Sequence, residues 1–282
     1  MTPSGDEALV TVIRPQRGWR LIDLRELWFF RELQYFLVWR DVKVRYKQTS
    51  LGIGWALLQP LLTMITFSVL FGGLAGLGQR TDGIPYPLFV FSGLLLWTFF
   101  SSTVTAATTS MISNQQLISK VYFPRIMIPW GTIGAGLVDL AISFLLFVGM
   151  LIWYGVVPGL SLLLLPVLIF ILTLTAAGVG TTLAALAATY RDFRYLVTFF
   201  IQLWLYATPV IYPLSLVPEK WRWLLCLNPL TGILEAFRFM VFGIMPEQFL
   251  LLTCLSTAAS LVMFLVSLHW FQRLERTFAD II

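Results

Sequence analysis

The sequence has little charge and few of the residues that build metal or nucleotide sites. Charged residues make up 12% of its 282 residues, and it contains two cysteines and one histidine. Cys226 and Cys254 are too few for a disulfide framework, and we expect both to be unpaired. No His or Cys cluster has metal-ligand spacing, and no GxxxxGKS or GxxxxGKT string is present to cradle ATP phosphates. We therefore expect no metal site, no cofactor and no ATP hydrolysis by this chain itself.

Apolar residues take the place of the missing charge. They make up 58% of the chain, and the mean hydropathy is +0.83, whereas ordinary soluble domains are near half apolar and a quarter charged. A membrane-spanning helix needs roughly 20 apolar residues to cross about 30 Å of hydrocarbon. The sequence therefore predicts an all-α polytopic membrane protein with six transmembrane helices. The predicted spans are Leu51–Gly73, Tyr86–Met111, Ile126–Tyr154, Leu160–Thr189, Phe193–Tyr212 and Phe249–Phe271.

Three residues inside these runs are unusual for a span. Pro60 and Pro166 are tolerated in lipid-embedded helices, where we expect them to cause local bends. Asp139 raises the free energy of membrane insertion by about 3 kcal/mol, whereas each Leu, Ile, Phe or Val in the run lowers it by about 0.3–0.6 kcal/mol. The apolar residues outweigh Asp139, so we still predict that this segment spans the membrane. An intramembrane acid is a functional candidate by default. Alternatively, Asp139 bonds a neighbouring helix or lies near a watery vestibule, since no basic partner is evident within the spans.

The distribution of Lys and Arg predicts the orientation in the membrane. An even number of spans places both termini on one side. With the N-terminus inside, the inner segments hold 15 of the 19 Lys and Arg residues and the outer segments hold 4. This asymmetry predicts cytoplasmic termini. It also explains the net charge of +5 without a nucleic-acid partner. Residues 1–50 are too polar for a signal-peptide core, so we expect no cleaved signal.

The segment before the first span predicts a helix lying in the membrane interface, at residues 23–47, after an N-terminal cytoplasmic segment of residues 1–22. Asp23 suits its N-cap. Such a helix turns its basic face toward lipid phosphates, and its simplest role is a passive anchor. The expected apolar stripe contains Phe29, Leu33, Phe36 and Leu37. The expected polar side contains Arg25, Glu26, Glu32, Arg40, Asp41, Lys43, Arg45 and Lys47.

Two short loops are predicted on the inner side. The first, residues 112–125, reads ISNQQLISKVYFPR and has room for one or two helical turns. Such a loop is usually a connector. The second, residues 189–195, reads TYRDFRY, in which Arg191, Asp192 and Arg194 are close enough for local ion pairs in a solvated tight turn.

Residues 213–248 are too apolar for an ordinary external loop and too broken for one span. Pro218 and Pro229 each suit the first turn of a short helix, and Gly243 suits the end of the second. Glu235 and Arg238 lie three residues apart, so they can pair on one helix face. Two short helices that dip into the outer leaflet fit this pattern if protein shields them. A large loop lying on the membrane surface is the alternative.

Three stretches resemble a known family. They are RDVKVRYKQTSLGIGWALLQP at residues 40–60, TYRDFRY at residues 189–195 and NPLTGILEAFR at residues 228–238. They resemble the membrane subunits of type-2 ABC exporters, in the branch that exports O-antigen, teichoic acid and capsule chains, and the resemblance covers nearly the whole chain. It implies a non-enzymatic homodimeric pore joined to two copies of a separate ATPase subunit. Its substrate would be a glycan on a polyprenyl diphosphate, moved out through the bacterial inner membrane.

The resemblance also implies roles for the three unusual segments. In such exporters the amphipathic helix touches the ATPase, the first inner loop carries a coupling helix, and a re-entrant hairpin forms an outer gate. The residues expected to couple to the ATPase are Gln116, Lys120, Arg191, Asp192 and Arg194. Those expected at the outer gate are Trp221, Glu235 and Arg238.

Three spans carry mixed aromatic and polar residues at helical spacing, so that each set shares one face. Sugars offer a flat C–H face and a rim of hydroxyls, which suit such walls. We therefore expect these faces to line a glycan channel, although small and hydroxylated residues also serve ordinary helix packing. The faces are Trp55, Gln59, Thr63 and Thr66; Trp97, Ser101, Thr105 and Thr108; and Tyr195, Phe199, Gln202 and Tyr206.

Other functions remain open at this point. The scarcity of buried acids argues against an ion-coupled transporter, and the lack of an internal repeat suggests that a pathway needs two copies. A small-molecule or drug efflux permease of the same fold would have a narrower, greasier pore. A membrane enzyme or scaffold acting on lipid-linked sugars would need a carboxylate or His cluster facing a cavity, for which Asp139 is the only buried candidate.

Overall fold

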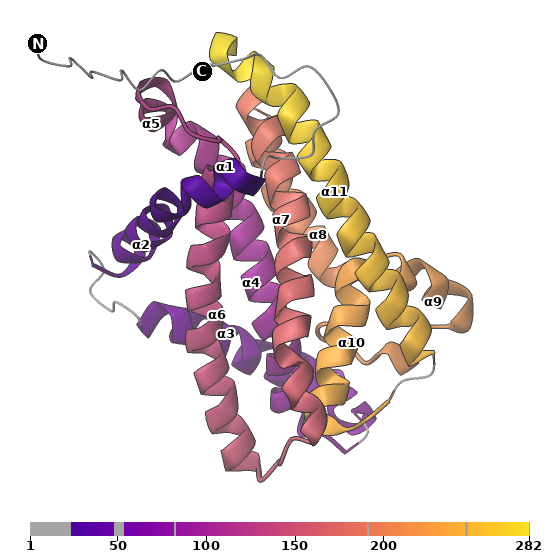
Figure 1. The fold of residues 1–282 in the computed structure, drawn as a ribbon. Coiled ribbons are helices and arrows are strands. Elements are labelled where there is room, and N and C mark those ends of the chain that lie inside the picture. The colour runs from indigo at the N-terminus through magenta and orange to yellow at the C-terminus, as the bar shows by residue number, and fades with distance from the viewer. Residues whose placement is uncertain (1–23, 48–53, 82, 191, 246–247, 282) are drawn as a thin grey trace, which may run out of the picture.

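The computed structural model describes residues 24–47, 54–81, 83–190, 192–245 and 248–281, which are almost entirely helical and contain no strand (Figure 1). The N-terminal segment 1–22, the Asp23 cap and Arg191 lie outside these residues. The α-helices are α1 (Leu24–Phe29), α2 (Arg31–Lys47), α3 (Gly54–Phe67), α4 (Tyr86–Ser113), α5 (Gln115–Lys120), α6 (Met127–Tyr154), α7 (Leu165–Thr189), α8 (Phe193–Ala207), α9 (Glu219–Cys226), α10 (Pro229–Phe242) and α11 (Phe249–Ile281). A π-helix at Ser68–Leu74 follows α3, and 3₁₀ turns occur at Leu77–Arg80, Leu160–Leu164 and Leu214–Leu216.

Five of the described helical segments are long and apolar enough to cross a membrane, and a polytopic all-α membrane protein is confirmed. They correspond to the first, second, third, fourth and sixth predicted spans. The predicted fifth span is the shorter α8, whose 15 residues rise only about 22 Å, against roughly 30 Å of hydrocarbon. The pair α9 and α10, bent by 100°, also passes as one broken span and would raise the count to six.

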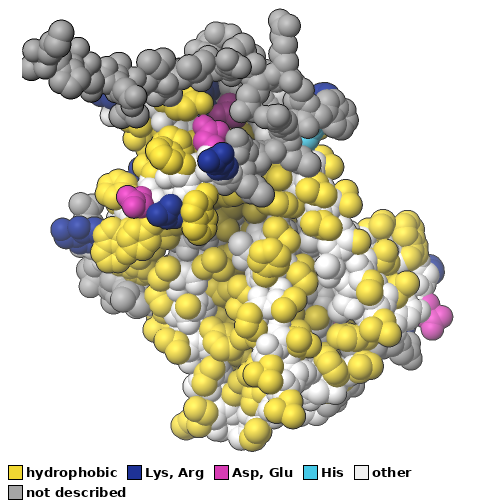
Figure 2. Space-filling model, in the orientation of Figure 1, with side chains coloured by type: hydrophobic (Ala, Val, Ile, Leu, Met, Phe, Trp, Pro, Cys, Tyr) yellow, Lys and Arg dark blue, Asp and Glu magenta, His cyan; other side chains and the backbone are white. Residues whose placement is uncertain are grey.

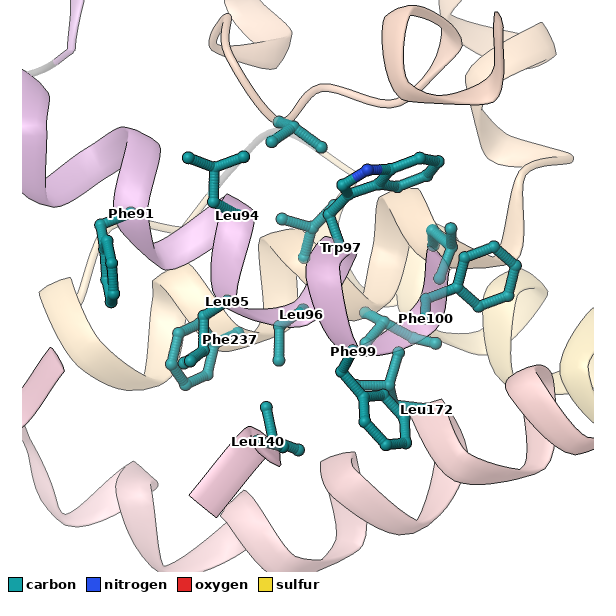
Figure 3. Packing of buried hydrophobic residues seen from close by; sticks show 14 of the residues in the cluster. Phe91, Leu94, Leu95, Leu96, Trp97, Phe99, Phe100, Leu140, Leu172 and Phe237 are labelled. Carbon is teal, nitrogen blue, oxygen red and sulfur yellow. The ribbon is translucent and has the colours of Figure 1, made fainter. Parts of the chain in front are cut away.

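Helix α4 is the centre of the molecule. It packs against α6 and α7 and also contacts α3, α8 and α10, because apolar side chains surround it on all sides. Figure 3 shows side chains of α4 meeting Leu140 of α6, Leu172 of α7 and Phe237 of α10. The Phe147 ring of α6 lies 6.1 Å from that of Phe91 and 5.5 Å from that of Phe237. This aromatic cluster fixes α6 and α10 against α4.

Helix α11 lies along α7 and α10, where small residues allow close approach. A Cβ atom on Gly178 would lie 2.9 Å from the backbone nitrogen of Phe264, and one on Gly232 would lie 2.5 Å from the carbonyl oxygen of Leu252. The Gly232 N–H donates to Ser256 Oγ at 3.0 Å. Such small-residue contacts are the usual means by which helices associate in lipid.

Two local expectations need correction. Pro166 lies in the first turn of α7, not inside the helix, so it removes no helical hydrogen bond and does not act as an internal bend. The predicted interface helix is divided at Phe30 into α1 and α2. Its predicted apolar stripe is also divided, because Leu37 is buried against α6 while Phe29 and Phe36 are exposed.

Exposed side chains differ between the body and the ends of the molecule. Figure 2 shows hydrophobic side chains over most of the body of one face, while the charged side chains in view gather near α1 and α2 and at the α9 edge. Exposed large hydrophobics occur along most of α11, on α6 from Val138 onward and in the first turns of α7, where they can contact lipid. Helix α5 and the end of α11 lie at the same end of the bundle as α1 (Figure 1).

Candidate functional site

Helix α8 has two sharply different faces. Val197 and Ile201 are buried, and α8 packs against α4 and α7. Tyr195, Phe199 and Tyr206 are 80%, 57% and 64% exposed, and Gln202 between them is exposed too. The predicted face of the fifth span therefore exists and is uncovered in the single chain. In a membrane it must meet lipid, a second copy of the chain or a water-filled path.

The predicted faces of α3 and α4 are only partly exposed. Gln59 and Thr66 are exposed on α3, and Thr105 is exposed on α4. Trp97 and Thr108 are instead buried in the packing of the chain itself. Because α4 contacts both α3 and α8, the three faces belong to adjacent helices.

The hydroxyl groups of these faces are satisfied within their own helices. Thr63 donates to the Gln59 carbonyl at 2.9 Å, Thr66 to the Leu62 carbonyl at 2.8 Å, and Thr105 to the Ser101 carbonyl at 2.7 Å. These back-bonds stabilise a hydroxyl in an apolar setting. Each Thr hydroxyl oxygen acts only as a donor in these bonds, so it can still accept a hydrogen bond from a ligand or water.

Helix α10 is anchored by a buried ion pair. Arg238 Nη1 donates to Glu235 Oε1 at 2.9 Å, which confirms the predicted pairing, and both side chains are at most 10% exposed. Arg238 Nη2 donates to the carbonyl of Val210 at 2.9 Å, and the guanidinium carbon lies 3.8 Å from the centroid of the Phe89 ring. One guanidinium thus joins α10, α4 and the chain after α8. Trp221 of α9, the third predicted gate residue, is exposed.

A second polar contact joins α10 to α8. Asn228 caps α10 by accepting from the Leu230 N–H, and it accepts from Trp204 Nε1 of α8 at 3.0 Å. Its amide nitrogen donates to Thr208 Oγ1 at 2.9 Å. Asn228 was not among the functional residues predicted from the sequence, although an Asn immediately before a helical Pro is a capping signal. The end of α8 and the start of α10 are therefore held together.

The loop at residues 112–125 contains the six-residue helix α5, in agreement with the expected one or two turns. Gln116 and Lys120 are both exposed on it. Leu117 and Ile118 pack against the buried cluster that includes Leu37 and Phe271. The apolar side of α5 therefore packs against this cluster, while Gln116 and Lys120 lie on its exposed side.

Side chains after α5 tie the loop to two other elements. Tyr122 OH donates to Glu26 Oε1 of α1 at 3.4 Å, and Arg125 Nη1 donates to the Glu275 carbonyl of α11 at 3.1 Å. Partial burial, then the charge of Glu26 and the hydrogen bond to it, raises the pKa of the Tyr122 hydroxyl, which therefore stays a donor. The loop is therefore held against α1 and α11.

In the second inner loop, Asp192 is exposed and Arg194 is half-buried. These two described members of the predicted charge cluster form no ion pair with each other, and Arg194 Nε has no hydrogen-bond partner in the described part of the chain.

Asp139 has a basic partner that lies outside the spans. Arg45 Nη1 and Tyr46 OH of α2 donate to its two carboxylate oxygens. This partner was not predicted from the sequence of the spans, because Arg45 lies 94 residues before Asp139, in a helix that packs on α6. Partial burial, followed by the bond to Asp139 and its charge, raises the pKa of the Tyr46 hydroxyl, so Tyr46 remains a donor.

A search against families of known proteins matches the ABC-2 type transporter model to residues 33–242, a stretch that includes all three quoted motifs. The chain belongs to the ABC-2 type transporter family. The resemblance noted from the motifs is thereby confirmed at the level of the family.

Three relatives show how this ABC-2 chain compares with characterised members. It is 31% identical to the O-antigen export system permease protein RfbA of Myxococcus xanthus over 217 residues, which cover 76% of this chain and 82% of that one. It is 28% identical to a Klebsiella pneumoniae protein of the same name over 245 residues, covering 86% and 92%. It is 23% identical to the polysialic acid transport protein KpsM of Escherichia coli over 209 residues, covering 71% and 77%.

Proposed function

We propose that this chain is the membrane permease of an ATP-driven exporter of a polysaccharide, with an O-antigen-like glycan as substrate. The observation that carries the proposal is the similarity to two O-antigen export permeases over 82% and 92% of their lengths. The polysialic acid transport protein supports a long glycan as the common substrate class. The proposed substrate is carried on a polyprenyl diphosphate and moves outward through the bacterial inner membrane.

We further propose that two copies of the chain form the channel and that two copies of a separate ATPase drive it. The exposed aromatic face of α8 supports this arrangement, since a single copy leaves Tyr195, Phe199 and Tyr206 uncovered. The proposed channel wall combines this face with Trp55, Gln59, Thr63 and Thr66 of α3 and with Ser101 and Thr105 of α4. Trp97 and Thr108 support that wall from within the chain.

The inner end is the proposed docking surface for the ATPase. The surface is proposed to contain Gln116 and Lys120, which are exposed on α5, and Asp192 and Arg194 of the second loop. Arg191, also proposed for this surface, lies outside the described residues. Both termini are proposed to be cytoplasmic, in agreement with the excess of Lys and Arg in the inner segments. The chain then divides into residues 1–22, the interface helix 23–47 and the transmembrane domain 48–282.

The outer end is proposed to carry a gate made by α9 and α10, in which Trp221 faces outward and the Glu235–Arg238 pair fixes α10. The 100° bend between the two helices and the burial of α10 by α4, α7 and α11 support a re-entrant hairpin shielded by protein.

The other functions are less favoured. An enzyme acting on lipid-linked sugars needs an available acid cluster, whereas both oxygens of Asp139 accept hydrogen bonds from Arg45 and Tyr46. A drug efflux permease would suit a greasier wall than one containing Gln59, Ser101, Thr105 and Gln202.

The test is transport by reconstituted protein. We expect vesicles that contain this chain and its ATPase to move a polyprenyl-diphosphate-linked glycan only when ATP is hydrolysed, and vesicles with this chain alone to move none. The matched control is the same complex with a non-hydrolysable ATP analogue. Transport by this chain alone, or ATP-driven transport of a drug but of no glycan, would contradict the proposal.

A further inference from the structure

A cavity of about 270 Å³ with a mixed polar and apolar lining lies between α2, α3, α4 and α6. All three residues of the Arg45–Tyr46–Asp139 contact line it. Its lining is Arg45, Tyr46, Trp55, Gln59, Pro60, Leu95, Thr98, Phe99, Ser102, Asp139, Leu140 and Ser143. Eight of these twelve side chains carry hydrogen-bonding groups, while most of the lined surface is apolar. Such a lining suits water or a ligand that has both polar and apolar parts.

The charges in the cavity favour a neutral ligand. Among the described residues that line it, Arg45 is the only cationic one, and it is paired with the only anionic one, Asp139. The pair has no net charge to attract a phosphate or an ammonium group. A carboxylate has about four lone-pair positions, and Asp139 uses one on each oxygen for Arg45 and Tyr46. About two acceptor positions therefore remain for hydroxyl groups of a ligand.

The rest of the lining supplies the complementary groups. The side-chain amide of Gln59 makes no hydrogen bond to any described residue, so both its donor and its acceptor are available. Trp55 is half-exposed, and its indole offers a broad apolar surface with a polar edge. Leu95, Phe99 and Leu140 form an apolar floor.

The size of the cavity limits the ligand. Pockets for drug-sized ligands usually measure about 300–1,000 Å³, so about 270 Å³ has room for one small ring. A pyranose ring matches both the size and the mixed lining, because it has hydroxyls that donate and accept around apolar C–H faces.

We propose that this cavity is a binding site for a single neutral sugar ring, with Trp55 against the ring and Asp139 and Gln59 bonding its hydroxyls. The ring belongs either to the exported glycan or to a glycolipid headgroup at the membrane surface. The inference rests on the proposed function for the choice of a sugar, but binding is measured without transport.

The experiment measures binding of methyl glycosides to the full-length protein. The protein is purified in a polyoxyethylene detergent, since sugar-based detergents would occupy the site. Saturation-transfer NMR with the methyl α-glycosides of glucose, mannose and galactose gives the apparent affinity. We expect at least one of them to bind, and we expect W55L to weaken it by about fivefold through loss of the aromatic contact.

The matched control is W39L, because Trp39 of α2 is 52% exposed against 49% for Trp55 and does not line the cavity. It should bind as the unaltered protein does. A second variant, Q59L, replaces an exposed α3 side chain and should weaken binding without loss of folded protein. Absence of binding for all three glycosides, or equal loss in W39L and W55L, would overturn the proposal.

Two further comparisons separate the possible outcomes. The first comparison is with octyl glucoside, used below its critical micelle concentration. If it binds far more tightly than the methyl glycoside, the ring belongs to a glycolipid headgroup. If the two affinities are equal, the ring belongs to the glycan. Failure of the cavity to bind sugars while ATP-driven glycan transport persists overturns the site alone. Sugar binding without any glycan transport overturns the proposed function and leaves the site.

Discussion

Arg238 joins three parts of the chain through one guanidinium group. Its guanidinium bonds Glu235 on its own helix and the Val210 carbonyl, and it stacks on Phe89 of α4. A buried pair of this kind contributes little compared with an apolar pair of the same size, but breaking it leaves an uncompensated charge. Its importance therefore lies in where it holds α10.

We expect Arg238→Ala to lower the free energy of unfolding by about 3 kcal/mol or more, because Glu235 is left buried without a partner. SDS-induced unfolding in mixed micelles measures the change. Arg80→Ala removes an exposed arginine and should have almost no effect. The double variant E235L/R238L should recover much of the lost free energy of unfolding, because it leaves no unpaired buried charge. If it is as unstable as Arg238→Ala, the unpaired charge of Glu235 is not the cause of the loss.

Single residues also show what the sequence could predict. The spacing of Glu235 and Arg238 was sufficient to predict their contact, because three residues on a helix fix the geometry. The intramembrane position marked Asp139 as unusual, but its partners Arg45 and Tyr46 depend on how α2 packs on α6. Local periodicity contains no information on such long-range packing.

Among the elements, hydropathy predicted the long helices closely, since apolar length is the dominant requirement in lipid. It was less accurate where the chain changes direction. The predicted span at Phe193–Tyr212 ends as α8 at Ala207, because the backbone then turns toward Asn228 and Arg238. The amphipathic helix was expected to be one piece, and the break at Phe30 was not visible in its pattern.

Helix α5 is the element whose role is easiest to test. We expect the double variant Q116A/K120A to reduce ATPase binding or to uncouple ATP hydrolysis from export, because these exposed side chains lie on the proposed docking surface. Pull-down with the ATPase and the ratio of export to hydrolysis are the measurements. Ser113 is exposed near α5 and offers a control in S113A. Normal binding and normal coupling in the double variant would move the docking surface to another element, such as α2.

For the whole molecule, the uncovered face of α8 gives a test of the channel. We expect cysteines placed at Phe199, Gln202, Gln59 and Thr63 to react with a water-soluble thiol reagent when ATP turnover is blocked in an open state. Cysteines at the buried positions Val197 and Ile201 should stay protected. The background is the variant in which Cys226 and the exposed Cys254 are replaced by Ser. Protection of the first four positions in every state would place the channel on another face.

The close contacts of α10 also constrain the order in which the protein is made. Phe89 and Val210 are synthesised before Arg238, whereas Leu252 and Ser256, which fit against Gly232, are synthesised after it. A charged residue such as Arg238 costs roughly 2.5–3.5 kcal/mol at the centre of a helix entering lipid alone, so α10 is poorly suited to independent insertion by the translocon. The partners of Arg238 are already synthesised when α10 is made, whereas the α11 residues that pack against Gly232 are synthesised only afterwards. Helix α11, translated after α10, thus completes the packing around α10.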